Sequence, residues 1–309
     1  MTASSLDRYK GCLIGLAVGD AIGTTVEFQA PGSFAPVTDM VGGGVFQLRA
    51  GQWTDDTSMA LCLGESLLNK QGFDPKAQMA RYHSWMRHGY LSSTGECFDI
   101  GNATREAILN FERTGEGYSG SQDPNSAGNG SIMRLAPVPM FYGAKPESAI
   151  HFAGLSSKTT HAATECIDAC MGFAACILGA LYGWSKEDIL SDKPIKEFLG
   201  AATLAPKVEE VLGGSYKDSE PPLIRGTGYV VKSLEAALWA FHKSNTYEEG
   251  VLLAVNLGED ADTTAAVYGQ LAGAFYGFAA IPGHWVNKLA YGDLIEDLAE
   301  QLYKHAYKG

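Results

Sequence analysis

Glycine recurs at every fourth position in two apolar stretches that stand near opposite ends of the chain. The two sets are Gly11, Gly15, Gly19 and Gly23, and Gly269, Gly273 and Gly277. Residues four apart lie on one face of an α-helix, and each glycine inside a helix costs about 1 kcal/mol relative to alanine. Close approach of two helix backbones is the simplest compensating gain. We therefore expect helices at 6–22 and 264–279 to lie together at the buried centre.

Most of the remaining sequence also has helical periodicity, with apolar residues three and four positions apart. Further helices are expected at 57–69, 75–88, 102–113, 145–156, 162–182, 194–203, 228–243, 246–256 and 293–307. The segments 114–130 and 213–227 are rich in Gly, Ser, Pro and Asn, which is typical of surface loops. Alternating strand patterns are scarce and no linker divides the chain. The sequence predicts an all-α fold and a single domain over residues 1–309.

The charge balance excludes several classes of partner. Lys and Arg number 23 against 35 Asp and Glu, a net charge of −12. A chain this acidic is not expected to hold nucleic acid through its phosphates, nor to bind an anionic membrane. The stretch between Asp262 and Lys288 lacks charge but contains many small residues, so we interpret it as a buried core helix and not a membrane span.

The cysteines and the N-terminus bear on the compartment. The six cysteines, at 12, 62, 97, 166, 170 and 176, form no CxxC pair. Several lie in apolar helical contexts, which is typical of reduced core residues in a cytosolic protein. The opening MTASSLDRYKGCLIG lacks the ordered regions of a signal peptide. We expect a cytoplasmic protein.

Two acidic clusters, Thr54-Asp55-Asp56-Thr57 and Asp260-Ala261-Asp262-Thr263-Thr264, each precede an apolar helical stretch. Either cluster alone is explained by helix capping, since carboxylates in a first turn are favoured by the helix dipole. A cap needs only one oxygen, however, and the two clusters together offer about six to eight oxygen donors, the ligand set of Mg²⁺ or Mn²⁺. Without a cation, such closely spaced carboxylates would repel one another.

Other polar residues can be explained either by a functional role or by an ordinary structural one. Asp20 and Glu27, in GLAVGDAIGTTVEF, are candidate site acids or unremarkable acids. The small residues of 128–131 (GNGS) let backbone N–H groups approach a ligand, although a plain turn explains them equally. His161 lies at a helix start, where it could contact a ligand or satisfy the local structure.

Seven segments then occur in a recognisable order. They are GLAVGDAIGTTVEF, GQWTDDTSMAL, DIGNATREAI, GNGSIMRLAPVP, THAATEC, GTGYVVKSLEAAL and NLGEDADTTAAVYGQLAGAFYG. This series resembles the ADP-ribosylglycohydrolase family, and within it the bacterial dinitrogenase reductase-activating branch. The resemblance extends from about Tyr9 to Trp285. It implies a compact, orthogonal multi-helix bundle and a centre of two Mg²⁺ or Mn²⁺ ions.

The resemblance also implies roles for individual residues. Its metal ligands correspond to Thr54, Asp55, Asp56, Asp260, Asp262 and Thr263. Its catalytic acids correspond to Asp55, Asp56, Asp99 and Glu27. The residues that contact ADP-ribose correspond to Gly128, Asn129, Gly130, Ser131, Met133, His161 and Tyr229, and we place Asp20 at the same substrate site.

The implied reaction is removal of ADP-ribose from a protein arginine, with Asp55, Asp56 or Asp99 as the proton acceptor for the attacking water. The expected partner is therefore an ADP-ribosylated protein, and a monomer is the simplest assembly. Two alternatives stay open. The chain could hydrolyse another ADP-ribose linkage (O-linked serine, O-acetyl-ADP-ribose or poly(ADP-ribose)), or it could bind ADP-ribose without catalysis.

One position departs from the family pattern. The family usually has Gly-Gly-Asp before the second cluster, whereas this chain has Gly258-Glu259-Asp260. Glu259 therefore replaces a glycine that could serve a special backbone angle, and it adds negative charge beside the implied metals.

Overall fold

The computed structural model describes residues 5–200 and 202–308, whose regular structure is helical. The α-helices are α1 (Ser5–Gly23), α2 (Asp55–Lys70), α3 (Pro75–His88), α4 (Asn102–Thr114), α5 (Pro137–Phe141), α6 (Pro146–Lys158), α7 (Thr164–Leu181), α8 (Lys186–Ile189), α9 (Pro206–Leu212), α10 (Val230–Lys243), α11 (Tyr247–Val255), α12 (Ala261–Tyr276), α13 (Gly283–Val286) and α14 (Gly292–Lys308). Short helices of other types are η1 (Thr24–Val26), η2 (Pro124–Ser126), η3 (Ile195–Leu199) and η4 (Phe278–Ala280). Within these residues β pairing is limited to isolated bridges. The all-α prediction is confirmed.

The two glycine-spaced helices, α1 and α12, pack against each other along their glycine faces, as predicted. A Cβ atom built on Gly273 would lie 1.9 Å from the carbonyl oxygen of Gly11, and one built on Gly15 would lie 2.4 Å from that of Gly269. As residue numbers rise along α1, those of the facing glycines in α12 fall, so the two helices are antiparallel. Side chains on either face would hold the backbones apart, which explains why glycine is required there.

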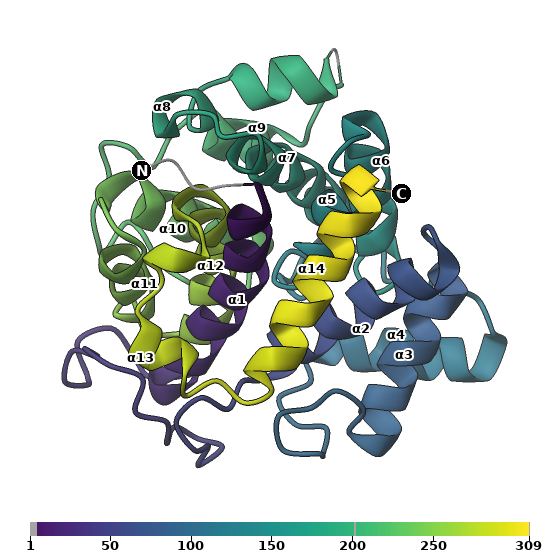
Figure 1. Ribbon diagram of the computed structural model, residues 1–309, viewed down its shortest axis with the longest axis horizontal. Coiled ribbons are helices and arrows are strands. Elements are labelled where there is room, and N and C mark those ends of the chain that lie inside the picture. Colours follow the sequence, from purple (N-terminus) through teal and green to yellow (C-terminus); the bar gives the residue numbers. More distant parts are fainter. Residues whose placement is uncertain (1–4, 201, 309) are drawn as a thin grey trace.

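The other helices surround this central pair (Figure 1). Helices α10 and α11 pack on α12, while α14 crosses from α1 to α2 and α5. Helices α2, α3 and α4 form a group on the side away from α10 and α11. The central pair thus carries the C-terminal end of α1 and the N-terminal end of α12 to the region where α2 begins.

The longer predicted helices agree with the structure to within a few residues at each end, but the one at 194–203 is wrong. That segment contains only the five-residue π turn η3, and residue 201 lies outside the described residues. Helices α5, α8, α9 and α13 were not predicted. They have four to seven residues, too few to show an apolar period. The predicted loop 114–130 contains the short helix η2.

Most of the cysteines and most of the apolar helices α7 and α12 are buried inside the protein. All six thiols are free, and only Cys97 is more than slightly exposed. Helix α7 is long and apolar enough to cross a bilayer, but 78% of this helix is buried inside the protein. Helix α12, in the uncharged stretch after Asp262, is buried over most of its length, as expected of a core helix.

Candidate active site

The first acidic cluster is fixed in place by Asp20, near the C-terminal end of α1. One Asp20 carboxylate oxygen accepts hydrogen bonds from the N–H and the hydroxyl of Thr54, and the other accepts from the N–H and the hydroxyl of Thr57. Asp20 therefore takes the place of a capping side chain for α2, whose own N-cap residue, Thr54, makes no capping hydrogen bond. Asp55 and Asp56 occupy the first turn of the helix that is held in this way.

The sequence predicted Asp20 at the substrate site, and the structure places it behind the first cluster. Its side chain is fully buried behind the cluster and both of its oxygens are occupied by protein donors. Asp20 is a positioning residue for the cluster.

The second cluster lies at the N-terminus of α12, beside the end of α1. A Cβ atom built on Gly23 would lie 2.3 Å from the Cα of Asp262, so the two segments are in direct contact. The hydroxyl of Thr263 donates to Asp56 across 3.3 Å. This hydrogen bond joins residues of the two clusters, which are 207 positions apart in sequence. The structure therefore brings the two clusters together, as the sequence predicted.

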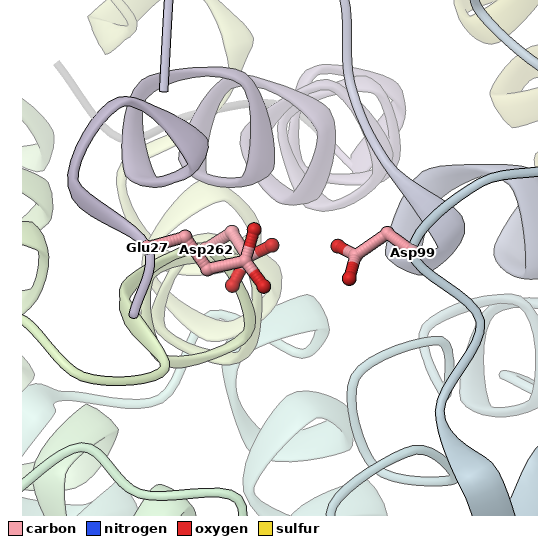
Figure 2. A group of neighbouring side chains, drawn as sticks. All are labelled: Glu27, Asp99 and Asp262. Atoms are coloured by element: carbon pink, nitrogen blue, oxygen red, sulfur yellow. The ribbon is translucent and has the colours of Figure 1, made fainter. Parts of the chain in front are cut away.

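Glu27 and Asp99 add two further carboxylates from separate segments. Glu27 follows η1, and Asp99 precedes α4 with a left-handed φ of 54°. One oxygen from each of Glu27, Asp99 and Asp262 lies within 4.8 Å of the other two. Figure 2 shows the carboxylates of Glu27 and Asp262 side by side and that of Asp99 pointing toward them across a gap. Three segments thus direct oxygens at one small volume.

Burial and the charges of neighbouring acids make the ionised form of these carboxylates unfavourable. Burial, followed by the neighbouring charge of Asp99, raises the pKa of Glu27 to about 9. Burial, followed by the charge of Asp20, raises the pKa of Asp99 to about 7. Burial also raises the pKa of Asp55, Asp56 and Asp262 well above the ordinary range. A bound cation would relieve this repulsion.

The glycine loop of residues 128–131 closes one side of the same site. The side-chain amide of Asn129 donates to Asp260 at 2.9 Å, so this loop also orients the second cluster. A Cβ atom built on Gly130 would lie 2.8 Å from the Cε1 of His161 and 3.2 Å from the hydroxyl of Thr104. Only glycine fits between these two side chains.

A pocket of about 600 Å³ opens over these groups. Its acidic lining consists of Glu27, Asp55, Asp99, Asp260 and Asp262. Its remaining lining is Phe28, Phe46, Ile100, Gly101, Asn102, Ala103, Thr104, Gly128, Asn129, Gly130, Met133, His161, Gly228 and Thr263. The volume suits a ligand of nucleotide size, and neither Lys nor Arg is among the described residues of this lining.

Some of the predicted site residues lie away from this pocket. Thr54 and Asp56 sit just behind its wall, fully buried, beside Asp20 and Thr263. The hydroxyl of Ser131 is turned into the core, where it accepts from Ser157 at 2.8 Å.

Tyr229 lies in an adjoining pocket that shares Gly128 and Gly228 with the first. There its hydroxyl donates to Glu165 at 2.6 Å and accepts from Lys207 at 3.1 Å. Tyr229 is thus placed to meet a ligand that extends beyond the main pocket.

Sequence reasoning missed Phe28 and Phe46. It included Thr57 in the first cluster but did not foresee that Thr57 donates to Asp20. Phe28 follows Glu27 directly and remains 67% exposed, but an isolated aromatic residue in a loop does not indicate that it borders a pocket.

Glu259 lies beside the site without entering it. Its carboxylate forms an ion pair with the exposed guanidinium of Arg225. Its backbone has a left-handed φ of 56°, accepts a hydrogen bond from the N–H of Phe28 and donates one to the carbonyl of Gln29, both at 2.7 Å. Glu259 therefore ties the segment after Glu27 to the second cluster, and its charge is compensated by Arg225.

Comparison with known proteins assigns this chain to a family. A sequence model described as ADP-ribosylglycohydrolase matches residues 1–309. The chain belongs to the ADP-ribosylglycohydrolase family. This match confirms the resemblance carried by the seven sequence segments. As a family member, the protein is an enzyme of the glycosidase class.

Individual relatives cover nearly the whole chain. ADP-ribosylarginine hydrolase Tri1 of Pseudomonas putida (strain GB-1) is 45% identical over 302 residues, which are 98% of this chain and 79% of that protein. The ADP-ribosyl-dinitrogen reductase glycohydrolase of Rhodospirillum rubrum is 31% identical over 299 residues, 94% of this chain and 92% of that protein. A solved structure described as an ADP-ribosylglycohydrolase-related protein complex is 43% identical, with a TM-score of 0.87 over 98% of this chain and 99% of that chain.

Proposed function

We propose that this enzyme hydrolyses the N-glycosidic bond between ADP-ribose and an arginine of a modified protein, and that it holds two Mg²⁺ or Mn²⁺ ions. The observation that carries the proposal is the convergence of Glu27, Asp55, Asp99, Asp260 and Asp262 on one pocket whose described lining contains neither Lys nor Arg. The names of the relatives, two of them ADP-ribosylarginine hydrolases at 45% and 42% identity, support arginine as the attachment point.

The residues present fit a divalent metal centre. The carboxylate oxygens Glu27 Oε2 and Asp56 Oδ1 are buried without a hydrogen-bond partner among the described residues. Buried anionic oxygens without partners are costly unless a cation binds them. All the donors are oxygens, the set that hard six-coordinate cations prefer. We assign the ions to Thr54, Asp55, Asp56, Asp260, Asp262 and Thr263.

When bound, divalent cations neutralise these carboxylates and polarise oxygen atoms of the ribose and of water. The chain's own groups then have separate tasks. Asp55 and Asp99 line the pocket, where a carboxylate can accept the proton of the attacking water. Glu27 faces Asp99 across a gap (Figure 2), where it can orient the leaving guanidine. That guanidine takes up the proton that the attacking water gives to the carboxylate, and it departs as guanidinium.

The activity is tested with a peptide that carries ADP-ribose on arginine. Purified enzyme should release free ADP-ribose, and EDTA should abolish the release. The double variant Asp55→Asn/Asp262→Asn should lose turnover by at least about 1,000-fold, which is the scale of removing charged groups from a reacting centre. Asp168→Asn is the matched control, because Asp168 is a buried carboxylate that accepts a hydrogen bond from the N–H of Ala205 and does not line the pocket.

A panel of linkages separates the rival activities. Faster release from O-linked serine, O-acetyl-ADP-ribose or poly(ADP-ribose) than from arginine would reject the arginine assignment. Calorimetric binding of ADP-ribose without release from any of these substrates would show a binding protein instead of an enzyme. Full turnover by the double variant would reject the metal assignment.

A further inference from the structure

Arg134 is a fully buried arginine that the proposed reaction does not use. Its exposed fraction is zero, and its guanidinium lies 4.7 Å from the ring centre of Tyr82. Its hydrogen bonds go to neutral oxygens, which are the carbonyls of Gly130 and Ser156 and the hydroxyls of Thr159 and Thr160. A buried cation without a carboxylate partner is energetically costly. Arg134 lies behind the wall of the pocket, where its charge can act on the groups that line it.

The first contact of Arg134 acts on the glycine loop. Its guanidinium donates to the carbonyl oxygen of Gly130. In a trans peptide the carbonyl and the following N–H point in opposite directions, so the N–H of Ser131 points away from Arg134. The described residues supply no acceptor for the N–H groups of Gly130 and Ser131. A positive charge at the carbonyl end of this peptide strengthens its N–H as a donor.

The second contact of Arg134 acts on His161 through Thr160. The guanidinium donates to the Thr160 hydroxyl at 2.8 Å, and that hydroxyl lies 2.8 Å from the Nδ1 of His161. Arginine is only a donor, so Thr160 uses a lone pair to accept from it and has its own proton left for Nδ1. The reverse assignment would leave a fully buried hydroxyl proton with no acceptor. Neutral His161 therefore carries its proton on Nε2.

The Nε2–H of His161 is aimed at the glycine loop. A Cβ atom built on Gly130 would lie 3.2 Å from Nε2, and one on Gly128 would lie 3.4 Å from it. No described residue accepts a hydrogen bond from this nitrogen, although His161 is 97% buried and lines the pocket. Burial, reinforced by the charge of Arg134, lowers the pKa of His161 to about 3. The ring is thus a neutral donor at neutral pH.

We propose that Arg134 is a positioning residue for the anionic part of the substrate. It sets the glycine-loop peptide and, through Thr160, the His161 ring so that both present N–H donors to the diphosphate oxygens. Its buried charge attracts the same anion from behind the wall, in a pocket whose described lining has no Lys or Arg. This inference rests on the proposed function, because it takes ADP-ribose as the ligand.

The wild-type protein provides the first test, which does not depend on a variant folding. Long-range ¹H–¹⁵N NMR at pH 7 should show His161 with a protonated Nε2 and an unprotonated Nδ1. A ring protonated on Nδ1 would overturn the relay through Thr160.

Calorimetry on variants provides the second test. Arg134→Met should weaken binding of ADP-ribose about 10- to 100-fold, the range for charge-assisted hydrogen bonds, while a neutral ligand, adenosine, should lose less than about threefold. Arg134→Lys should recover part of the loss. The matched control is Arg8→Met, because Arg8 is also buried and donates to the backbone carbonyls of Ala180, Ala274 and Phe275. Its removal should leave ADP-ribose binding unchanged.

Equal losses for ADP-ribose and adenosine in Arg134→Met would show a merely structural role and overturn the inference. If the variant does not fold, the NMR result decides. If wild-type protein binds no ADP-ribose, the proposed function fails, whatever the state of His161.

Discussion

Asp20 accepts hydrogen bonds from both the backbone N–H and the hydroxyl of Thr54, at 2.9 and 2.8 Å. It makes the same pair of bonds to Thr57, at 3.0 and 2.6 Å. One carboxylate on α1 thereby orients the start of α2, where Asp55 and Asp56 lie. The fold and the acidic centre are coupled through this side chain.

Asp20→Asn should therefore damage stability and metal binding together. The amide nitrogen of asparagine would face two donors, so we expect the free energy of unfolding to fall by about 2–3 kcal/mol. Mn²⁺ affinity, measured by calorimetry, should fall at least about tenfold, because the first cluster loses its orientation. Asp168→Asn serves again as the control and should affect only urea unfolding. Unchanged Mn²⁺ affinity in Asp20→Asn would show that the cluster holds its geometry without Asp20.

The metal-free enzyme should become less stable as pH rises from 7 to 8. Glu27 and Asp99 have ordinary pKa values of 4.5 and 3.8 in the unfolded chain, but about 9 and about 7 when folded. The folded state therefore retains protons that the unfolded state has lost, and the stability that they provide disappears as pH approaches the folded values. We expect a loss of about 1.5 kcal/mol over this interval, measured by urea unfolding in EDTA.

Two controls accompany the pH measurement. Saturating Mn²⁺ should flatten the dependence, because cations replace the protons, and Asp55→Asn/Asp262→Asn should make the slope shallower. His161 does not confuse the result, since its folded pKa of about 3 leaves it neutral at pH 7 and above. Stability that increases with pH in EDTA would contradict the raised carboxylate pKa values.

Gly273→Ala should destabilise the protein strongly. The added methyl would lie 1.9 Å from the carbonyl oxygen of Gly11, so α1 and α12 would have to separate. We expect a loss of about 3 kcal/mol, the upper part of the range for overpacking. Gly283→Ala is the matched control, because no atom lies within 4 Å of its added Cβ. Equal melting temperatures for the two variants would show that the glycine faces are not in close contact.

Glu259 is best tested with two substitutions that both remove the ion pair with Arg225. Glycine accepts the left-handed φ of 56° without strain, whereas alanine does not. Glu259→Gly should therefore be more stable than Glu259→Ala by about 1 kcal/mol. Both should keep kcat/KM within about twofold, because an exposed ion pair contributes little and Glu259 does not line the pocket. A large loss of kcat in Glu259→Gly would show that this charge acts on the reaction.

Much of the site could be predicted because its signals are local. The four-residue glycine period indicates a helix face, and two such faces near the ends of the chain identify α1 and α12 as partners. The paired Asp-Thr clusters at helix starts indicate oxygen donors directed at a common point.

The features that the sequence did not reveal depend on tertiary structure. Asp20 lies on the correct helix, but the sequence does not show whether its carboxylate meets the pocket or the N–H groups of Thr54 and Thr57. Arg134 stands alone in an apolar run, and its hydrogen-bond partners at Ser156 and Thr160 lie more than twenty residues away. A short element such as α8 contains only four residues, so no period can identify it.

The antiparallel pairing of α1 with α12 also has a consequence for how the enzyme matures during synthesis. Helix α1 leaves the ribosome early, but the glycine face that it requires is translated about 250 residues later, and contacts so distant in sequence form late. Until α12 emerges, α1 exposes its glycine face, and the two halves of the acidic centre cannot meet. The acidic centre, and with it the proposed metal site, can thus form only after nearly all of the chain has been translated, so we expect a prematurely terminated product to be inactive.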